Sequence, residues 1–154
     1  IMAIAMPDAV LVAHKDRAQD VKKAVELLKT AEINQADIFP KDYRPWGWFE
    51  SLILGSGFQV KRIHVKPGAA LSLQSHQFRS EHWIVVEGLA TVTINDQIQL
   101  VAVGESVYVP VGAKHRMENN EKSPMALIEV QTGSYLGEDD IVRYEDRYAR
   151  NQDI

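Results

Sequence analysis

Two segments rich in polar and turn residues interrupt a run of strand-like sequence, and they constrain the fold of this chain more than any other feature. The first, KPGAALSLQSHQFRSEHWIVVEG, spans 66–88, and the second, GESVYVPVGAKHRMEN, spans 104–119. Both combine histidine, carboxylate or amide side chains with the Gly and Pro residues that mark turns. We expect the two segments to meet around one metal ion inside a β-barrel.

The sequence from 46 onward alternates short apolar runs with turn residues. WGWFESLIL and FQVKRIHV are separated by Gly55-Ser56-Gly57, and Asn95-Asp96 lies between the alternating runs TVTI and QIQL, as in a β-hairpin. Further strands are predicted at 70–74, 81–86, 90–94, 97–101, 106–109, 115–118 and 125–131. Many short strands with this punctuation indicate an all-β sandwich or barrel rather than a βαβ fold.

The N-terminal part of the chain follows a different pattern. Residues 8–13 (DAVLVA) are predicted to form a lone strand with no early partner, and apolar residues recur at helical spacing over 16–30. The stretch 31–45 is polar, contains two prolines and is predicted to be a linker. We therefore divide the chain into a strand–helix–linker extension, 1–42, and a β-rich domain, 43–154.

Composition excludes several classes of function. A net charge of −4 argues against nucleic acid as a partner, because phosphate backbones are bound by basic faces. No apolar run reaches the roughly 18 residues that a membrane span needs. The absence of cysteine excludes disulfides and thiolate chemistry, and it fits a cytoplasmic protein. Histidine, carboxylate and amide groups remain as metal ligands.

The two segments 66–88 and 104–119 supply such ligands at suitable spacing. Side chains alternate between the faces of a strand, so Gln74 and His76 are expected to face the same side. Glu81 follows a short turn, and His115 comes from a separate strand. This mixture of nitrogen and oxygen ligands suits one divalent ion of Zn, Mn, Co, Ni or Fe. We predict that these four residues bind it.

The spacing within both segments resembles the two motifs of the cupin superfamily. From Gly68 to Gly88 the order is glycine, five residues, glutamine, one residue, histidine, four residues, glutamate, six residues, glycine. This resembles the first cupin motif with glutamine in place of its first histidine. The segment from Gly104 to Asn119 matches the second motif position for position. The resemblance implies a cupin double-stranded β-helix (a jelly-roll barrel) with one N-terminal α-helix.

A tighter resemblance covers nearly the whole chain. YRPWGWFE, LSLQSHQFRSEHWIVVEG, YVPVGAKHRMEN and IEVQTGSYLGEDDIVRYEDRY resemble the C-terminal cupin domain of type II phosphomannose isomerases. Such domains usually follow a mannose-1-phosphate guanylyltransferase domain, and the extension 1–42 resembles the junction to it. Glutamine is the usual first ligand in that family. The resemblance implies metal-dependent interconversion of mannose 6-phosphate and fructose 6-phosphate, which supplies GDP-mannose for polysaccharide biosynthesis.

Two positions depart from the family pattern. Gln77 and Phe78 stand where the family usually has histidines, so we expect the ligand set to survive and the mouth of the site to differ. One alternative is therefore a non-catalytic sugar-phosphate-binding or dimerising cupin module of a guanylyltransferase. Another small cupin enzyme, such as an epimerase or a dioxygenase, is a third possibility.

An aldose–ketose isomerase also needs cations for the phosphate and a base that moves a proton between C1 and C2. Arg79 shares a strand face with Glu81, so we expect it inside the barrel as a catalytic and substrate-binding residue. Either Lys61 or Arg62 should face inward to bind substrate, and Arg143 is a further catalytic candidate. Candidates for the base are His64, Glu129, Tyr144 and Glu145.

The segment WGWFESLIL suggests how the chain associates. It would form a long apolar edge strand, which proteins tend to cover. Cupins commonly pair at a sheet edge, so we predict a homodimer.

Overall fold

The computed structural model describes residues 1–6, 8–37 and 39–148, which fall into two compact units. The first unit, Ile1–Pro40, begins with an antiparallel hairpin of β1 (Met2–Ala5) and β2 (Val10–Ala13). The predicted lone strand is therefore wrong, because β1 lies directly before it and pairs with it. No helix in the described part of the chain has the length and apolarity needed to cross a membrane.

The helical segment of the first unit is shorter as an α-helix than the spacing predicts. Residues Lys15–Asp20 form the 3-10 helix η1, and only Val21–Thr30 form the α-helix α1. The chain leaves α1 through Glu32, whose φ of 55° is the left-handed conformation that commonly ends helices. A second 3-10 turn, η2, follows at Asn34–Ala36.

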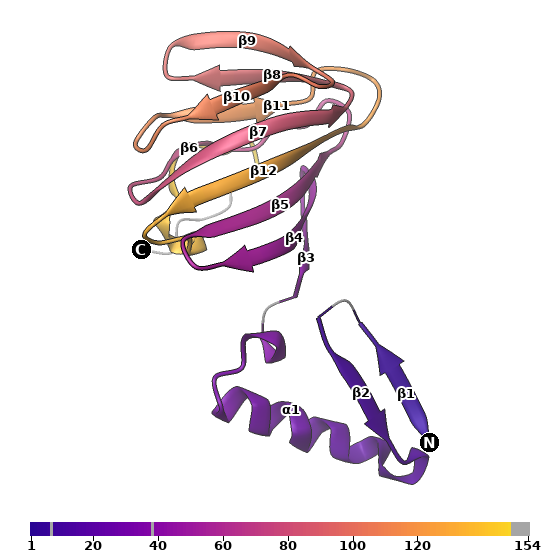
Figure 1. Cartoon of the computed structure of the whole chain (residues 1–154). Coiled ribbons are helices and arrows are strands. Elements are labelled where there is room, and N and C mark those ends of the chain that lie inside the picture. The colour runs from indigo at the N-terminus through magenta and orange to yellow at the C-terminus, as the bar shows by residue number, and fades with distance from the viewer. Residues whose placement is uncertain (7, 38, 149–154) are drawn as a thin grey trace. The chain divides into compact units, whose positions relative to one another are not determined.

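The second unit, Lys41–Ile154, contains two antiparallel sheets (Figure 1). The six-stranded sheet has the order β10-β7-β12-β5-β4-β3, and the five-stranded sheet has the order β13-β6-β11-β8-β9. Neighbouring strands are often distant in sequence, as where β12 lies between β7 and β5. The bounds are β3 (Lys41–Arg44), β4 (Gly47–Gly55), β5 (Phe58–Val65), β6 (Leu73–Ser75), β7 (Arg79–Glu87), β8 (Leu89–Ile94), β9 (Gln97–Ala102), β10 (Ser106–Val109), β11 (His115–Glu118), β12 (Met125–Gly133) and β13 (Val142–Glu145), with a 3-10 turn, η3 (Glu138–Asp140), before β13.

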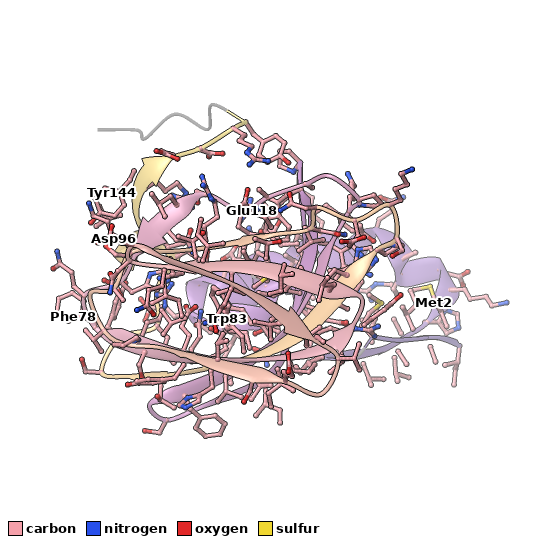
Figure 2. The ribbon with its side chains drawn as sticks, turned by 90° about the horizontal axis from the view of Figure 1, so that it is seen from above. Met2, Phe78, Trp83, Asp96, Glu118 and Tyr144 are labelled. Carbon is pink, nitrogen blue, oxygen red and sulfur yellow. The ribbon has the colours of Figure 1, made fainter. Side chains whose placement is uncertain are left out.

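The interior of the second unit is built from alternate residues of these strands. On β7, the odd-numbered residues from Arg79 to Val85 are buried, whereas Ile84 and Val86 are exposed. Trp83 accordingly lies in the interior in Figure 2. Apolar residues such as Met117 complete the core, while polar residues occupy the inward positions near the start of β7. Polar and apolar side chains therefore both point into the interior, and both line the cavity described below.

Two strand expectations need correction, and one further strand was not predicted. The predicted linker 31–45 ends in β3, which pairs with Gly47–Glu50 of β4. The long strand β4 is therefore not an edge strand, because β3 covers part of it. The further strand, β13, lies beyond the last predicted strand at 125–131; it pairs with β6 and so places Arg143 opposite Gln74. These short polar strands lack the apolar alternation by which strands are recognised in a sequence.

Candidate metal centre

Three buried side chains converge where β6, β7 and β11 come together. Ligand atoms of His76, Glu81 and His115 all lie within 4.8 Å of one another. Nε2 of His76 is 3.1 Å from Oε1 of Glu81, and Nε2 of His115 is 3.8 Å from Oε2 of the same carboxylate. The two imidazoles therefore approach the two oxygens of one carboxylate from different strands.

The backbone around the first histidine is fixed on both sides. His76 follows the end of β6, and its carbonyl oxygen accepts a hydrogen bond of 2.8 Å from the Gly112 amide. The next two amides, of Gln77 and Phe78, donate to the carboxylate of Asp140 at 3.0 and 3.3 Å. The turn between β6 and β7 is thus bound by groups from two distant parts of the chain.

The second histidine is held as a neutral ring. Nδ1 of His115 lies 2.9 Å from the Ala113 carbonyl oxygen, so a proton on Nδ1 leaves the Nε2 lone pair directed at Glu81. Burial lowers the pKa of His115, and this effect outweighs the opposing charge of Glu81. A neutral imidazole with one orienting hydrogen bond is the form in which histidine binds metals.

The carboxylate of Glu81 is oriented by its neighbours. The indole Nε1 of Trp83 donates to Oε2 at 2.9 Å, and Nε2 of Gln131 donates to Oε1 at 3.1 Å. Burial alone would raise the pKa of Glu81, but His76, His115 and Arg79 together hold it at about 2. The residue is therefore an ionised ligand at neutral pH.

Unpaired nitrogen atoms show that this cluster fits a cation. Within the described residues, the buried Nε2 atoms of His76 and His115 make no hydrogen bond. Buried polar atoms without partners are uncommon and call for an explanation. Two nitrogen lone pairs and an ionised carboxylate provide three of the ligands a divalent transition metal prefers.

Gln74 lies beside this cluster. It is directly opposite His115 in the β6–β11 ladder, and its Oε1 accepts a hydrogen bond of 2.8 Å from Ser72. Gln74 and Glu81 both line a cavity of about 500 Å³, counted out to its open mouth. The predicted fourth ligand therefore lies on the wall that the carboxylate also faces.

The cavity wall carries four cationic side chains, Arg44, Lys61, Arg79 and Arg143. Lys61 is 5% exposed, whereas Arg62 is exposed and packs over Trp48. The structure thus decides between the two neighbours that sequence parity left open. Arg44 was not among the residues predicted, because it falls in the segment expected to be a linker.

Arg79 lies closest to the metal-binding cluster. Its side chain is buried, its Nε is 3.6 Å from Oε1 of Glu81, and its Nη1 donates to the Gly137 carbonyl oxygen at 2.8 Å. The guanidinium is also 3.6 Å from the Asp140 carboxylate. Arg79 therefore connects the cluster to the turn that precedes β13.

The four candidates for the base occupy different environments. Glu129 is buried and lines the cavity, and it accepts a hydrogen bond of 2.8 Å from Gln131. His64 stacks on Trp48, and the other two, Tyr144 and Glu145, are exposed. Burial and the nearby charge of Glu81 raise the pKa of Glu129 well above its usual range. Of the four, Glu129 is the residue placed at the cavity.

Comparison with known proteins identifies the family. The family model for the mannose-6-phosphate isomerase C-terminal domain matches residues 31–146. The chain belongs to this family. The resemblance to the C-terminal domain of type II phosphomannose isomerases is therefore confirmed. The match includes every residue of the metal-binding cluster.

Curated relatives in this family are much longer proteins. Xanthan biosynthesis protein XanB of Xanthomonas campestris is 54% identical over 150 residues, which is 97% of this chain and 32% of the relative. Mannose-1-phosphate guanylyltransferase of Escherichia coli is 49% identical over 150 residues, 97% of this chain and 31% of that protein. The chain thus spans about a third of the length of these relatives.

Solved structures confirm the cupin fold. A Klebsiella pneumoniae protein with a double-stranded β-helix domain superimposes with a TM-score of 0.56 at 17% identity, covering 63% of this chain and 83% of that one. A cupin-superfamily sugar phosphate isomerase from Silicibacter pomeroyi superimposes with a TM-score of 0.51 at 24% identity, covering 55% and 58%. The predicted all-β double-stranded β-helix is therefore correct.

The two departures from the family pattern lie at the surface. Gln77 and Phe78 are exposed, and neither belongs to the residues that line the cavity. Phe78 lies at the periphery in Figure 2. Its ring packs edge to face on Tyr135, with the ring centroids 6.3 Å apart. Neither side chain therefore contributes to the wall of the cavity.

Proposed function

We propose that this chain interconverts mannose 6-phosphate and fructose 6-phosphate with one divalent metal ion. The proposal rests on one observation. Glu81 of the His–Glu–His cluster lines a cavity that also carries four cationic side chains. An aldose–ketose isomerase needs both parts, a metal for the sugar oxygens and cations for the phosphate. The family description supports the same reaction.

The cluster would hold the metal through His76, Glu81 and His115, with Gln74 as a fourth ligand. Once bound, the ion would polarise the sugar oxygens and offset the negative charge that develops when a proton leaves carbon. The protein orients its ligands through Trp83 on Glu81 and through the Ala113 carbonyl on His115.

The remaining side chains have distinct roles in this proposal. Arg79 places a buried positive charge beside Glu81, where it would stabilise an oxyanion of the sugar. Glu129 lines the cavity, and burial and the charge of Glu81 raise the pKa of its carboxyl, so it is assigned the exchange of a proton with the substrate. Lys61, Arg44 and Arg143 line the same cavity and would supply positive charge for the phosphate.

The chain's relatives suggest where the reaction would be used. Those relatives are named for mannose-1-phosphate guanylyltransferase activity and for xanthan or alginate biosynthesis. In the proposal, the isomerase supplies mannose 6-phosphate for GDP-mannose and polysaccharide synthesis.

The experiment measures turnover and metal content together. Purified chain is loaded in turn with Zn, Mn, Co, Ni or Fe and supplied with mannose 6-phosphate, and fructose 6-phosphate is measured. His76→Ala and His115→Ala are expected to remove both bound metal and activity. His82→Ala is the control, because His82 is exposed and packs on Tyr108. A wild-type protein that binds metal without turnover would contradict the proposal and favour a sugar-phosphate-binding module.

A further inference from the structure

Glu138 brings a carboxylate to a buried lysine from the solvent side of the cavity. Nζ of Lys61 lies 2.6 Å from Oε1 of Glu138. The lysine side chain is 6% exposed, whereas the glutamate side chain is 50% exposed. Both residues line the cavity. The charge of an interior cation is therefore balanced by a group that reaches it from the mouth.

The positive charges around the Glu138 carboxylate make its position favourable for any anion. Burial raises the pKa of Glu138, but the charges of Lys61, Arg79 and Arg44 outweigh burial and keep the pKa below its usual range. Three cations therefore act on one carboxylate. Of the other two carboxyl groups on the wall, Glu81 belongs to the metal-binding cluster, and Glu129 accepts a hydrogen bond from Gln131.

The turn that carries Glu138 is anchored through its neighbours. Gly137 accepts a hydrogen bond from Arg79, and the Asp140 carboxylate accepts two from the turn between β6 and β7. Glu138 itself is tied through its side chain to Lys61. A glutamate side chain has three rotatable bonds, so it can leave Lys61 while the anchored turn stays in place.

We infer that Glu138 is a displaceable carboxylate that occupies the position of the substrate phosphate in the free protein. A phosphate monoester entering the cavity replaces it at Lys61 and takes Arg44 as a second cationic partner. This rests on the proposed function for the identity of the substrate, but the binding site is defined by Lys61, Arg44 and Glu138 themselves.

The exchange sets the affinity of the cavity for phosphorylated sugars. A phosphate dianion carries more charge and more acceptor oxygens than a carboxylate, so it competes successfully for Lys61. An unphosphorylated hexose has no anionic group, so it leaves the Lys61–Glu138 ion pair intact. Glu138 thereby lowers the affinity for phosphorylated ligands alone, because only an anion competes with it for Lys61.

The test measures binding without turnover. Calorimetric titrations with mannose 6-phosphate, inorganic phosphate and mannose are performed on the metal-loaded wild type and on Glu138→Gln. The matched control is Asp139→Asn, which removes one negative charge from the same turn at a residue bonded to Tyr135 rather than to Lys61. Glu138→Ala is the second variant, because it removes the side-chain oxygens altogether.

Displacement predicts that both Glu138 variants bind mannose 6-phosphate and inorganic phosphate more tightly than wild type, by roughly three- to tenfold. Mannose affinity should not change, and Asp139→Asn should behave as wild type. Unchanged or weaker phosphate binding in folded Glu138 variants would overturn the inference, as would phosphate binding to none of the proteins. Tighter phosphate binding in a chain without isomerase activity would support the inference while the proposed function fails.

Discussion

The indole nitrogen of Trp83 donates a hydrogen bond of 2.9 Å to Oε2 of Glu81, two positions away on the same inward face of β7. The same indole packs edge-on against the ring of His115, with the ring centroids 5.5 Å apart. One core side chain therefore orients two of the residues assigned to the metal. Replacing an outer partner of this kind typically lowers metal affinity roughly 10- to 100-fold.

Trp83→Phe should weaken metal binding without removing a ligand. The phenyl ring preserves most of the packing but loses the N–H donor, so Glu81 is less well oriented. We expect the metal dissociation constant to rise roughly 10- to 100-fold, measured by competition with a chelator. Trp48→Phe is the control, because Trp48 stacks on His64 outside the cluster. Equal affinities in the two variants would contradict an orienting role for Trp83.

The neighbours Lys61 and Arg62 provide a matched test of the cavity wall. Lys61 is buried at the cavity, whereas Arg62 is exposed. Lys61→Met should raise the KM for mannose 6-phosphate roughly 30-fold, as expected for loss of about 2 kcal/mol from a charged hydrogen bond. Arg62→Met should change it less than about twofold. Steady-state kinetics measure the KM of both variants. Comparable increases in KM would show that Lys61 does not bind the substrate.

The fold and part of the site follow from local sequence patterns. Asn95-Asp96 was predicted to be a hairpin turn, and β8 and β9 do pair with Ile94 opposite Gln97, with Asn95 at a φ of 52°. Strand alternation likewise places Arg79, Glu81 and Trp83 on one face, which is the face that β7 buries. Both predictions need only short-range information, because turns and alternation are set by adjacent residues.

Other features depend on pairing between distant strands. Parity could not choose between Lys61 and Arg62, because the inward face of β5 is set by its register with β4 and β12. Arg44 and Glu138 lie in polar segments whose place at the cavity comes from long-range contacts, such as the pairing of β3 with β4. No local period in the sequence reports such contacts.

The ion pair between Glu138 and Lys61 should make stability depend on pH. The folded-state pKa of Glu138 is lowered, so the unfolded state binds its proton first as the pH falls. The stabilisation is therefore fully present above the unfolded value of about 4.3 and is lost as the pH falls through the lowered folded value. Urea denaturation of wild type and Glu138→Gln is expected to differ at pH 7 and to converge in acid. A difference that persists at the lowest pH would refute this account, and Asp139→Asn is the charge control.

Homodimer formation remains a prediction, with a surface that can now be specified. Leu52, Ile53 and Leu54 are 48–65% exposed on the part of β4 that extends beyond its pairing with β3. Light scattering should give about twice the monomer mass of 17.3 kDa. Leu54→Lys should shift the mass toward the monomer, because a charge would be buried in the interface. Ile98→Lys, at an exposed position on β9, is the control, and a monomeric wild type would exclude the dimer.

Two motif glycines allow backbone conformation to be separated from close packing. Gly88 and Gly104 both have positive φ, at 77° and 86°, so alanine is strained at either position. A Cβ at Gly88 would also lie 2.7 Å from the Pro124 carbonyl oxygen, whereas a Cβ at Gly104 would meet no atom within 4 Å. Gly104→Ala should therefore cost about 1 kcal/mol of unfolding free energy and Gly88→Ala about 3 kcal/mol. Urea denaturation measures both, and equal losses would show that the left-handed conformation alone requires glycine at these two positions.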